Sequence, residues 1–209
     1  FAMDDGCVLR LPLNELTGTF REDYSISGAD GTATGSIGTT TSKYGNAGYF
    51  DGDDYIDFGD PPDGHLDFGT SSFSYGFWIQ PMNLNGLLQV PFGRNTNLTG
   101  GYSIYQEINN KLAAYLDFTS GRKNAYINTA TVGTGTWVHV FVSVDQSAYS
   151  TGTARLYWNG IQTGTISSLG TGTINTTNRL NIGRHNSGLY YFNGYIDEVR
   201  IYNYALTNQ

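Results

Sequence analysis

Apolar and polar residues alternate one by one along several short stretches of this chain. In WVHVFVSVD (137–145), every second residue from Val138 to Val144 is a valine. A period of two is the pattern of a β-strand that buries one face. The same alternation in SFSYGFWIQP (72–81) predicts a strand that ends at Pro81.

Turn signals separate further runs of this kind. Asn159-Gly160 divides 154–166 into a hairpin, and Asn109-Asn110 lies between the runs 101–108 and 111–118. Further strands are expected at 10–16, 55–58, 179–184 and 195–202, and loops at GSIGTTTS and SLGTGTINTT. No long stretch has apolar residues at helical spacing opposite charged ones. The sequence therefore predicts an all-β fold, a two-sheet antiparallel β-sandwich.

The last predicted strand, GYIDEVRIY, contains an acid where the alternation asks for an apolar residue. Counting back by two from Val199 places Asp197 on the core side, while Glu198 shares the polar side with Arg200. A buried carboxylate without a partner is costly. Asp197 therefore needs hydrogen-bond donors, a cation or a place at the open rim of the sandwich.

Composition limits the classes of function. The chain has 209 residues, which suits one all-β domain (1–209), with residues 1–7 expected to be a processing remnant. Its net charge of −7 argues against binding to nucleic acid or to anionic membranes. The single cysteine, Cys7, precludes an internal disulfide framework. No apolar run is long enough for membrane insertion.

Six segments occur in an order typical of one protein family: FDGDDYIDFGD, FSYGFWIQP, WVHVFVSVD, RLYWNGIQTG, RLNIGR and FNGYIDEVRIYNYALT. Together they resemble the concanavalin A-like lectin/glucanase jelly rolls, in their laminin-G-like branch, over residues 8–207. The resemblance implies a two-sheet concanavalin A-like jelly roll whose chain ends lie together, often with bound calcium, in extracellular proteins. It implies no single activity, because this fold carries lectins, lyases, glucanases and adhesion domains.

Calcium is the cofactor that the resemblance implies. Calcium takes six to eight oxygen ligands, mainly from carboxylates, amides and carbonyls. DYSISGADGT resembles the family's early acidic loop, which lies near the closing Asp, so the predicted ligands are Asp23, Asp30 and Asp197. The alternative is that Asp197 accepts hydrogen bonds from neighbouring N–H groups and that Asp30 forms a turn with Gly31.

A second acidic run follows, and its spacing superficially resembles an EF-hand. Tyr55 and Ile56 stand where that loop needs an acid and a glycine, so the motif is rejected. We expect solvated turn carboxylates, with a second cation or a sugar contact as the alternative. The run comprises Asp51, Asp53, Asp54, Asp57, Asp60, Asp63 and Asp67.

Catalytic patterns are weak. Retaining glycosidases need two carboxylates about 5 Å apart, and none of the four glutamates is paired that way. The resemblance also implies that lyases of this fold use Tyr and His with Arg or Gln. His139 with Tyr105 or Tyr115 could form such a site, although no local motif supports it and His139 fits a structural role.

Sugar sites combine an aromatic ring with amides, carboxylates or arginines. RHNSGLYYFNG (184–194) offers Arg184, Asn186, Tyr190 and Tyr191 in one loop, and the loop 92–102 adds Arg94. We expect the two loops to form one rim that binds a glycan. The alternative is that the two tyrosines cover the end of the sandwich.

The sequence thus favours a non-catalytic carbohydrate-binding or adhesion module of a secreted protein, or of one on a cell or virion surface. Its expected partner is a glycan or polysaccharide, and the module is expected to belong to a larger protein. A polysaccharide lyase or glycoside hydrolase and a purely structural or protein-binding sandwich remain as alternatives.

Overall fold

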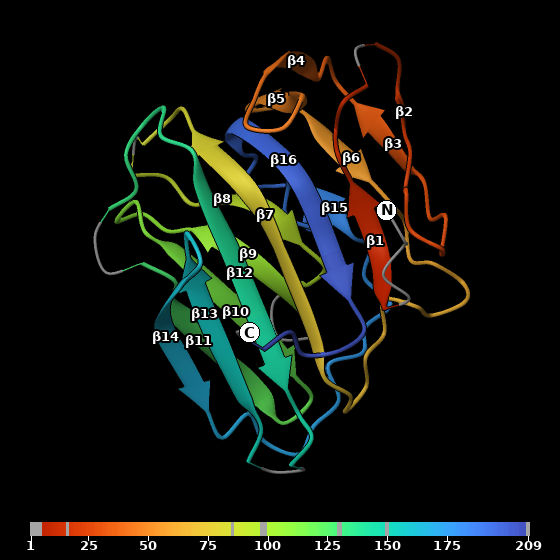
Figure 1. Ribbon diagram of the computed structural model, residues 1–209, viewed down its shortest axis with the longest axis vertical. Helices are drawn as coiled ribbons and strands as arrows, with labels where there is room; N and C mark the ends of the chain where they lie inside the picture. Colours follow the sequence, from red (N-terminus) through yellow and green to blue (C-terminus); the bar gives the residue numbers. More distant parts are fainter. Residues whose placement is uncertain are drawn as a thin grey trace.

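The computed structural model describes residues 6–15, 17–84, 86–96, 100–128, 131–148 and 151–207. They form two antiparallel sheets that face each other (Figure 1). This confirms the predicted β-sandwich. The described residues contain no helix, and hence none that could cross a membrane.

The first sheet lies in front in Figure 1 and has the order β14-β13-β12-β7-β16-β5-β4, with β1 pairing on β16. Its strands are β1 (Cys7–Leu11), β4 (Gly38–Thr41), β5 (Asn46–Asp51), β7 (Phe73–Pro81), β12 (Val138–Asp145), β13 (Thr153–Trp158), β14 (Ile161–Ser167) and β16 (Asn193–Tyr202). The first and last strands of the chain are therefore neighbours, as predicted.

The second sheet has the order β11-β10-β9-β8-β15-β6-β3-β2. Its strands are β2 (Phe20–Arg21), β3 (Gly31–Thr34), β6 (Tyr55–Asp57), β8 (Gln89–Gly93), β9 (Gly101–Gln106), β10 (Leu112–Phe118), β11 (Gly121–Tyr126) and β15 (Asn181–Ile182).

The core between the sheets is rich in aromatic rings. Phe73 and Tyr75 of β7 stack at 6.0 Å between centroids, and Tyr75 stacks on Phe92 of the second sheet at 5.1 Å. All three are essentially unexposed. The alternation that predicted β7 therefore arises because every second side chain enters this core.

The sequence prediction misplaced or missed several strands. The first strand is Cys7–Leu11 rather than 10–16, because Pro12 lacks an N–H group and Leu13 has φ 53°. GSIGTTTS, expected to be a loop, contains β4, a polar strand at the edge of the first sheet. The strands β8 and β11 were not predicted, because a register shift breaks the alternation of β8 and β11 is an edge strand.

The sequence prediction also placed Asp197 on the wrong face of the sheet. Asp197 is the register partner of Trp78, whereas Arg200 is that of Gly76, so one extra residue lies in β16. Glu198 has φ 49°, and this bulge shifts the alternation by one. Residues paired across antiparallel strands share a face. Asp197 thus lies with Trp78 on the outer face of the first sheet, not on the core side with Val199.

Asp197 is nevertheless fully buried. The turn after β4 covers it, and the Ser42 hydroxyl donates a hydrogen bond to its Oδ2. Its Oδ1 has no hydrogen-bond partner. Burial raises the pKa of Asp197 to about 6, although the Ser42 hydrogen bond opposes the shift.

Arg94, predicted to contact a glycan, is completely buried instead. Its Nη1 donates to Asp67 Oδ1 at 2.6 Å and to the Leu66 carbonyl at 2.8 Å. Its Nη2 donates to Asp60 Oδ1 at 2.6 Å and to the Thr176 carbonyl at 3.3 Å. The guanidinium therefore joins three loops and cannot contact a ligand at the surface, which corrects the prediction.

We expect Arg94→Met to lower the free energy of unfolding by about 3 kcal/mol, because it leaves two carboxylates and two carbonyls without their shared donor. Arg155→Met is the matched control. Its ion pair with Asp145 spans 3.8 Å between partly exposed side chains, so its loss should cost less than about 1 kcal/mol. Urea unfolding measures both values, and equal losses would contradict the assigned role of Arg94.

Candidate binding site

The loop between β15 and β16 is fixed by backbone hydrogen bonds at several points. Val90 N donates to the Tyr190 carbonyl at 2.8 Å, and Phe192 N donates to the Gly183 carbonyl at 2.9 Å. Tyr190 itself has φ 59°, which turns the chain sharply at the loop tip. Because β8 holds the loop tip and the loop's own two ends are hydrogen-bonded to each other, its backbone has a defined course.

Tyr190 and Tyr191 line one hollow of about 390 Å³ on the surface. Tyr190 is 42% exposed. The other walls are Asp51 and Gly52 after β5, Asn83, Leu87, Leu88 and Gln89 before and in β8, and Asn193 of β16. The hollow therefore combines two aromatic rings with a carboxylate and amide-bearing residues, which is the chemistry of a sugar site.

Arg184 supports Tyr191. Its guanidinium carbon lies 3.4 Å from the ring centre of Tyr55 and 5.8 Å from that of Tyr191. Such cation–π contacts contribute about 0.5–1 kcal/mol at exposed sites. The structure thus brings three of the predicted ligand residues together: Arg184, Tyr190 and Tyr191.

The other two predicted ligand residues lie elsewhere. Asn186 turns toward the second sheet, where its Nδ2 donates to the Arg179 carbonyl at 2.6 Å and its Oδ1 accepts from Asn181 Nδ2 at 3.0 Å. These bonds hold the loop and leave Asn186 no evident role toward the hollow. Arg94 is in the interior, and the second predicted loop is described only at 92–96 and 100–102.

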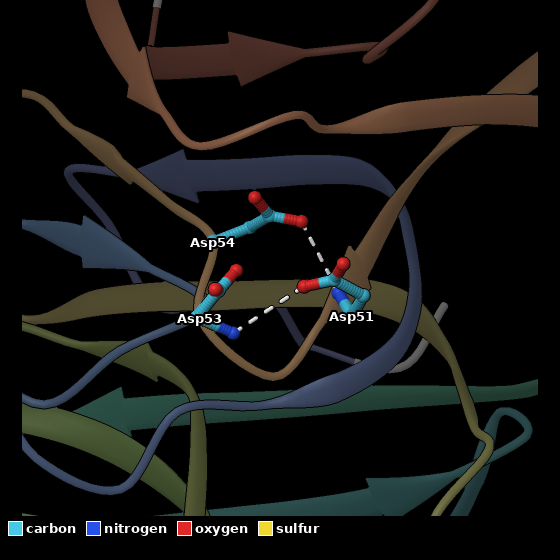
Figure 2. A group of neighbouring side chains, drawn as sticks. All are labelled: Asp51, Asp53 and Asp54. Atoms are coloured by element: carbon cyan, nitrogen blue, oxygen red, sulfur yellow. Dashed lines mark hydrogen bonds between the residues drawn. The ribbon is translucent and has the colours of Figure 1, made fainter.

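An acidic turn adjoins the hollow. The carboxylate oxygens of Asp51, Asp53 and Asp54 lie within 4.8 Å of one another, so the turn could hold a metal ion (Figure 2). Asp54 is buried and accepts from Ser36 N at 2.7 Å and from Asp51 N at 3.2 Å. The hydrogen bond and negative charge of Asp51 raise the pKa of Asp53. A cation would relieve this repulsion.

The predicted ligands Asp23, Asp30 and Asp197 do not form such a group within the described residues. Asp23 Oδ1 accepts from Arg10 N and Ser25 N, and Asp23 Oδ2 accepts from the Ser25 hydroxyl and Ala29 N, at 2.8–3.0 Å. Four donors use all four lone-pair positions of the carboxylate. Asp23 therefore does not fit a cation, whereas Asp197 Oδ1 has no partner. Calcium stays a prediction.

The sequence did not reveal a polar network on the outer face of the second sheet. The fully buried Asp117 accepts two hydrogen bonds from Arg122, at 2.6 and 2.9 Å, and one from Asn95 Nδ2 at 2.8 Å. The His185 ring lies 5.9 Å from the Tyr105 ring and 5.8 Å from that of Tyr190. His185, not His139, is thus the histidine beside Tyr105.

The hydrogen bonds define which atoms of this network remain free. Ser187 N donates to His185 Nδ1, so His185 Nε2 carries the hydrogen, and burial lowers the pKa of the ring. Asn95 and Asn181 each donate through Nδ2, which leaves their Oδ1 atoms as acceptors without partners. One donor and two acceptors, all unexposed, suit ordered water rather than an ion.

This network offers little to a lyase mechanism. Burial raises the pKa of Tyr105 to about 12, and burial together with the Glu107 hydrogen bond raises that of Tyr115. Neither phenol is a base near neutral pH. Arg122 is engaged with Asp117, and His139 lies on the first sheet, so the predicted pairing of His139 with Tyr105 or Tyr115 is not formed.

The chain resembles known proteins in sequence pattern and in fold. Residues 50–209 match the family model described as concanavalin A-like lectin/glucanases superfamily. A search of curated proteins finds no match.

Three solved structures illustrate the likeness. The binding domain of Paraclostridial Mosquitocidal Protein 1 has a TM-score of 0.78 at 16% identity, over 97% of this chain and 50% of that one. Domain 4 of AbnA, an extracellular arabinanase from Geobacillus stearothermophilus in complex with arabinotriose, has a TM-score of 0.70 at 21% identity. The match covers 97% of this chain and 94% of that one. The binding domain of botulinum neurotoxin DC, in complex with rat synaptotagmin II, has a TM-score of 0.72 at 17% identity. The match covers 99% of this chain and 50% of that one.

The chain spans about half the length of both toxin binding domains. At these identities the likeness shows the shared fold alone.

Asp197 provides a test that separates protonation from calcium binding. With chelator present, Asp197→Asn should raise the melting temperature at pH 8. The pKa of Asp197 is about 6 in the folded protein and about 4 in the unfolded chain, so the protonated side chain stabilises the folded state. This contribution to the free energy of unfolding is lost as pH rises from about 4 to 6 and amounts to at most about 3 kcal/mol. The variant should lack this loss, as thermal melts across pH would show.

The same melts with calcium test the cofactor prediction. If calcium binds at Asp197, Asp197→Asn lowers the melting temperature in calcium. If it binds at the acidic turn, Asp53→Asn removes the stabilisation by calcium and Asp197→Asn does not. If the melting temperature of each of the three proteins is the same with chelator as with calcium, the protein holds no integral ion.

Proposed function

Because the chain belongs to the concanavalin A-like lectin/glucanase superfamily, we propose that it is a non-catalytic carbohydrate-binding module. The observation that carries the proposal is the hollow lined by Tyr190 and Tyr191. Its rings offer apolar faces to the C–H groups of a sugar, and Asp51, Asn83 and Asn193 surround them with polar groups for hydroxyls.

The support for these rings is rigid. Tyr191 packs against Arg184 and lies 6.3 Å from the Tyr55 ring, while the Tyr190 carbonyl is bonded to β8. A site that is ordered before binding loses little conformational entropy when the ligand arrives. This favours recognition by stacking over a site that must form around its ligand.

We place the module in a secreted or surface protein of several domains. Two solved neighbours are toxin binding domains, of which this chain covers about half, and a third is one domain of an extracellular arabinanase. The arabinotriose in the third is a ligand of that protein, and it gives the first class of oligosaccharide to assay here.

The proposed function is tested by a glycan array combined with an assay for released reducing ends. We expect binding to one class of glycan without release. Release of reducing ends would favour the enzyme alternatives, and the absence of any glycan binding would favour a structural or protein-binding role. Repeating the array with chelator shows whether Asp51, which belongs to both the hollow and the acidic turn, acts through a cation.

The site is tested by replacing both tyrosines. Tyr190→Ala with Tyr191→Ala should remove glycan binding at the hollow, while the free energy of unfolding changes by about 1 kcal/mol or less. Tyr24→Ala, at a comparably exposed ring (46%), is the control and should leave both values unchanged. A large stability loss with intact glycan binding would show that the rings cover the sandwich end instead.

A further inference from the structure

The outer face of the first sheet carries a second set of aromatic rings. Trp78 of β7 lies 5.2 Å from His139 and 6.1 Å from Tyr44, and His139 lies 6.2 Å from Phe141. Beside them Tyr195 lies 4.7 Å from Tyr49 and 6.3 Å from Trp137. We call these seven residues the aromatic band: Tyr44, Tyr49, Trp78, Trp137, His139, Phe141 and Tyr195.

The sheet register explains why the rings gather here. His139, Trp78 and Asp197 are partners across β12, β7 and β16, so their side chains share this face. Gly76, in the next row, leaves room for Phe141, because a Cβ there would meet the Phe141 ring. Tyr44 is exposed and the other six rings are partly buried, whereas rings of a packed core would be fully buried.

Two segments border the band. On one side the turn after β4 places Lys43 Nζ 5.3 Å from the Trp78 ring centre. On the other side the C-terminal segment crosses β7 and β12 (Figure 1), where the Ser143 hydroxyl donates to the Leu206 carbonyl at 2.7 Å. Between these segments, the side chains of the face are not fully covered by the part of the chain that the structure describes.

Three hollows of about 350, 330 and 270 Å³ follow the band. All three include His139, so they adjoin one another around that ring. Trp78 lines the first two, and Phe141 lines the first and third. A row of connected hollows fits a ligand with several repeating units better than one small molecule.

The lining chemistry distinguishes a saccharide from a protein partner. Among the described residues that line the three hollows, Leu206 is the sole aliphatic side chain. The other lining groups include hydrogen-bonding side chains such as Asn159, Glu198 and Arg200. Protein interfaces also use aromatic residues and arginine, but here the rings surround separate hollows among hydrogen-bonding groups instead of forming one apolar patch, which favours a saccharide.

The charges on this face nearly cancel. Arg200 Nη2 bonds Glu198 Oε2 at 2.5 Å, and Arg200 Nε has no hydrogen-bond partner. Lys43, which lies over the Trp78 ring, and the buried Asp197 supply one further charge of each sign. A face without net charge favours neither an anionic nor a cationic ligand.

We propose that the aromatic band binds a neutral polysaccharide chain, as a second saccharide site whose three hollows share no lining residue with the Tyr190–Tyr191 hollow. The inference shares with the proposed function only the class of ligand. Two sites on one module would bind a long polymer more tightly than either binds alone, because the second contact is made at high effective concentration.

The test measures retardation in native gels that contain soluble neutral polysaccharides, namely arabinan, xylan, laminarin and galactomannan. Trp78→Ala is made in the wild type and in the Tyr190→Ala/Tyr191→Ala variant. The control is Tyr126→Ala, because Tyr126 is an exposed ring that Lys111 covers at 5.2 Å, much as Lys43 covers Trp78, but on the second sheet.

We expect the Tyr190→Ala/Tyr191→Ala protein, here called the loop variant, to keep measurable binding to at least one polymer. Trp78→Ala should weaken that residual binding at least tenfold, and Tyr126→Ala should not change it. If Trp78→Ala perturbs folding, Tyr44→Ala on the exposed turn (58% exposed) replaces it, and the melting temperature identifies that case.

Three results would overturn the inference. Loss of all binding in the loop variant would leave the proposed function intact and remove the second site. If Trp78→Ala in the loop variant leaves its residual polymer binding unchanged, the second site is likewise removed and the proposed function is intact. A wild-type dimer that Trp78→Ala converts to a monomer, seen by sedimentation, would make the band a contact between copies of this chain. If only the band binds polymer, the hollow is the site that fails.

Discussion

The structure depends on the pairing of β16 inside the first sheet. This last strand lies between β7 and β5 and also pairs with β1, so the two ends of the chain meet there. Its core-facing residues Ile196, Val199 and Ile201 are fully buried. Both candidate sites use this strand: Asn193 lines the hollow where β16 begins, and Tyr195, Glu198 and Arg200 flank or belong to the aromatic band.

The bulge at Glu198 decides what faces outward. Without the extra residue, Asp197 would point into an aromatic and aliphatic core, where an unpaired carboxylate is very costly. With it, Asp197 lies beneath the turn after β4 and bonds to Ser42. The same bulge places Glu198 and Arg200 on one side, close enough to form an ion pair. A local backbone irregularity thus sets the charge pattern of a whole sheet face.

Alternation in the sequence was sufficient to predict β7 and β12, because each of these strands has one face in the core, whereas the Asn159-Gly160 turn signal predicted the β13–β14 hairpin. It failed for β4 and β11, which are polar edge strands, and for Asp197, because a bulge cannot be seen in a pattern of residue types. Tyr190 and Tyr191 line one hollow, and their role as ligand residues stays a prediction. Arg94 was misplaced, since a buried arginine and a surface arginine look alike until their partners are known.

The central claim is that saccharides bind at the Tyr190–Tyr191 hollow of a rigid sandwich. Nuclear magnetic resonance of isotopically labelled protein, titrated with arabinotriose or the best ligand from the array, tests it most directly. The account predicts the largest shift changes at Tyr190, Tyr191, Asn83 and Asn193, with smaller changes in the second-sheet network around His185, whose ring contacts that of Tyr190. Shift changes confined to that network and absent from the hollow would contradict it.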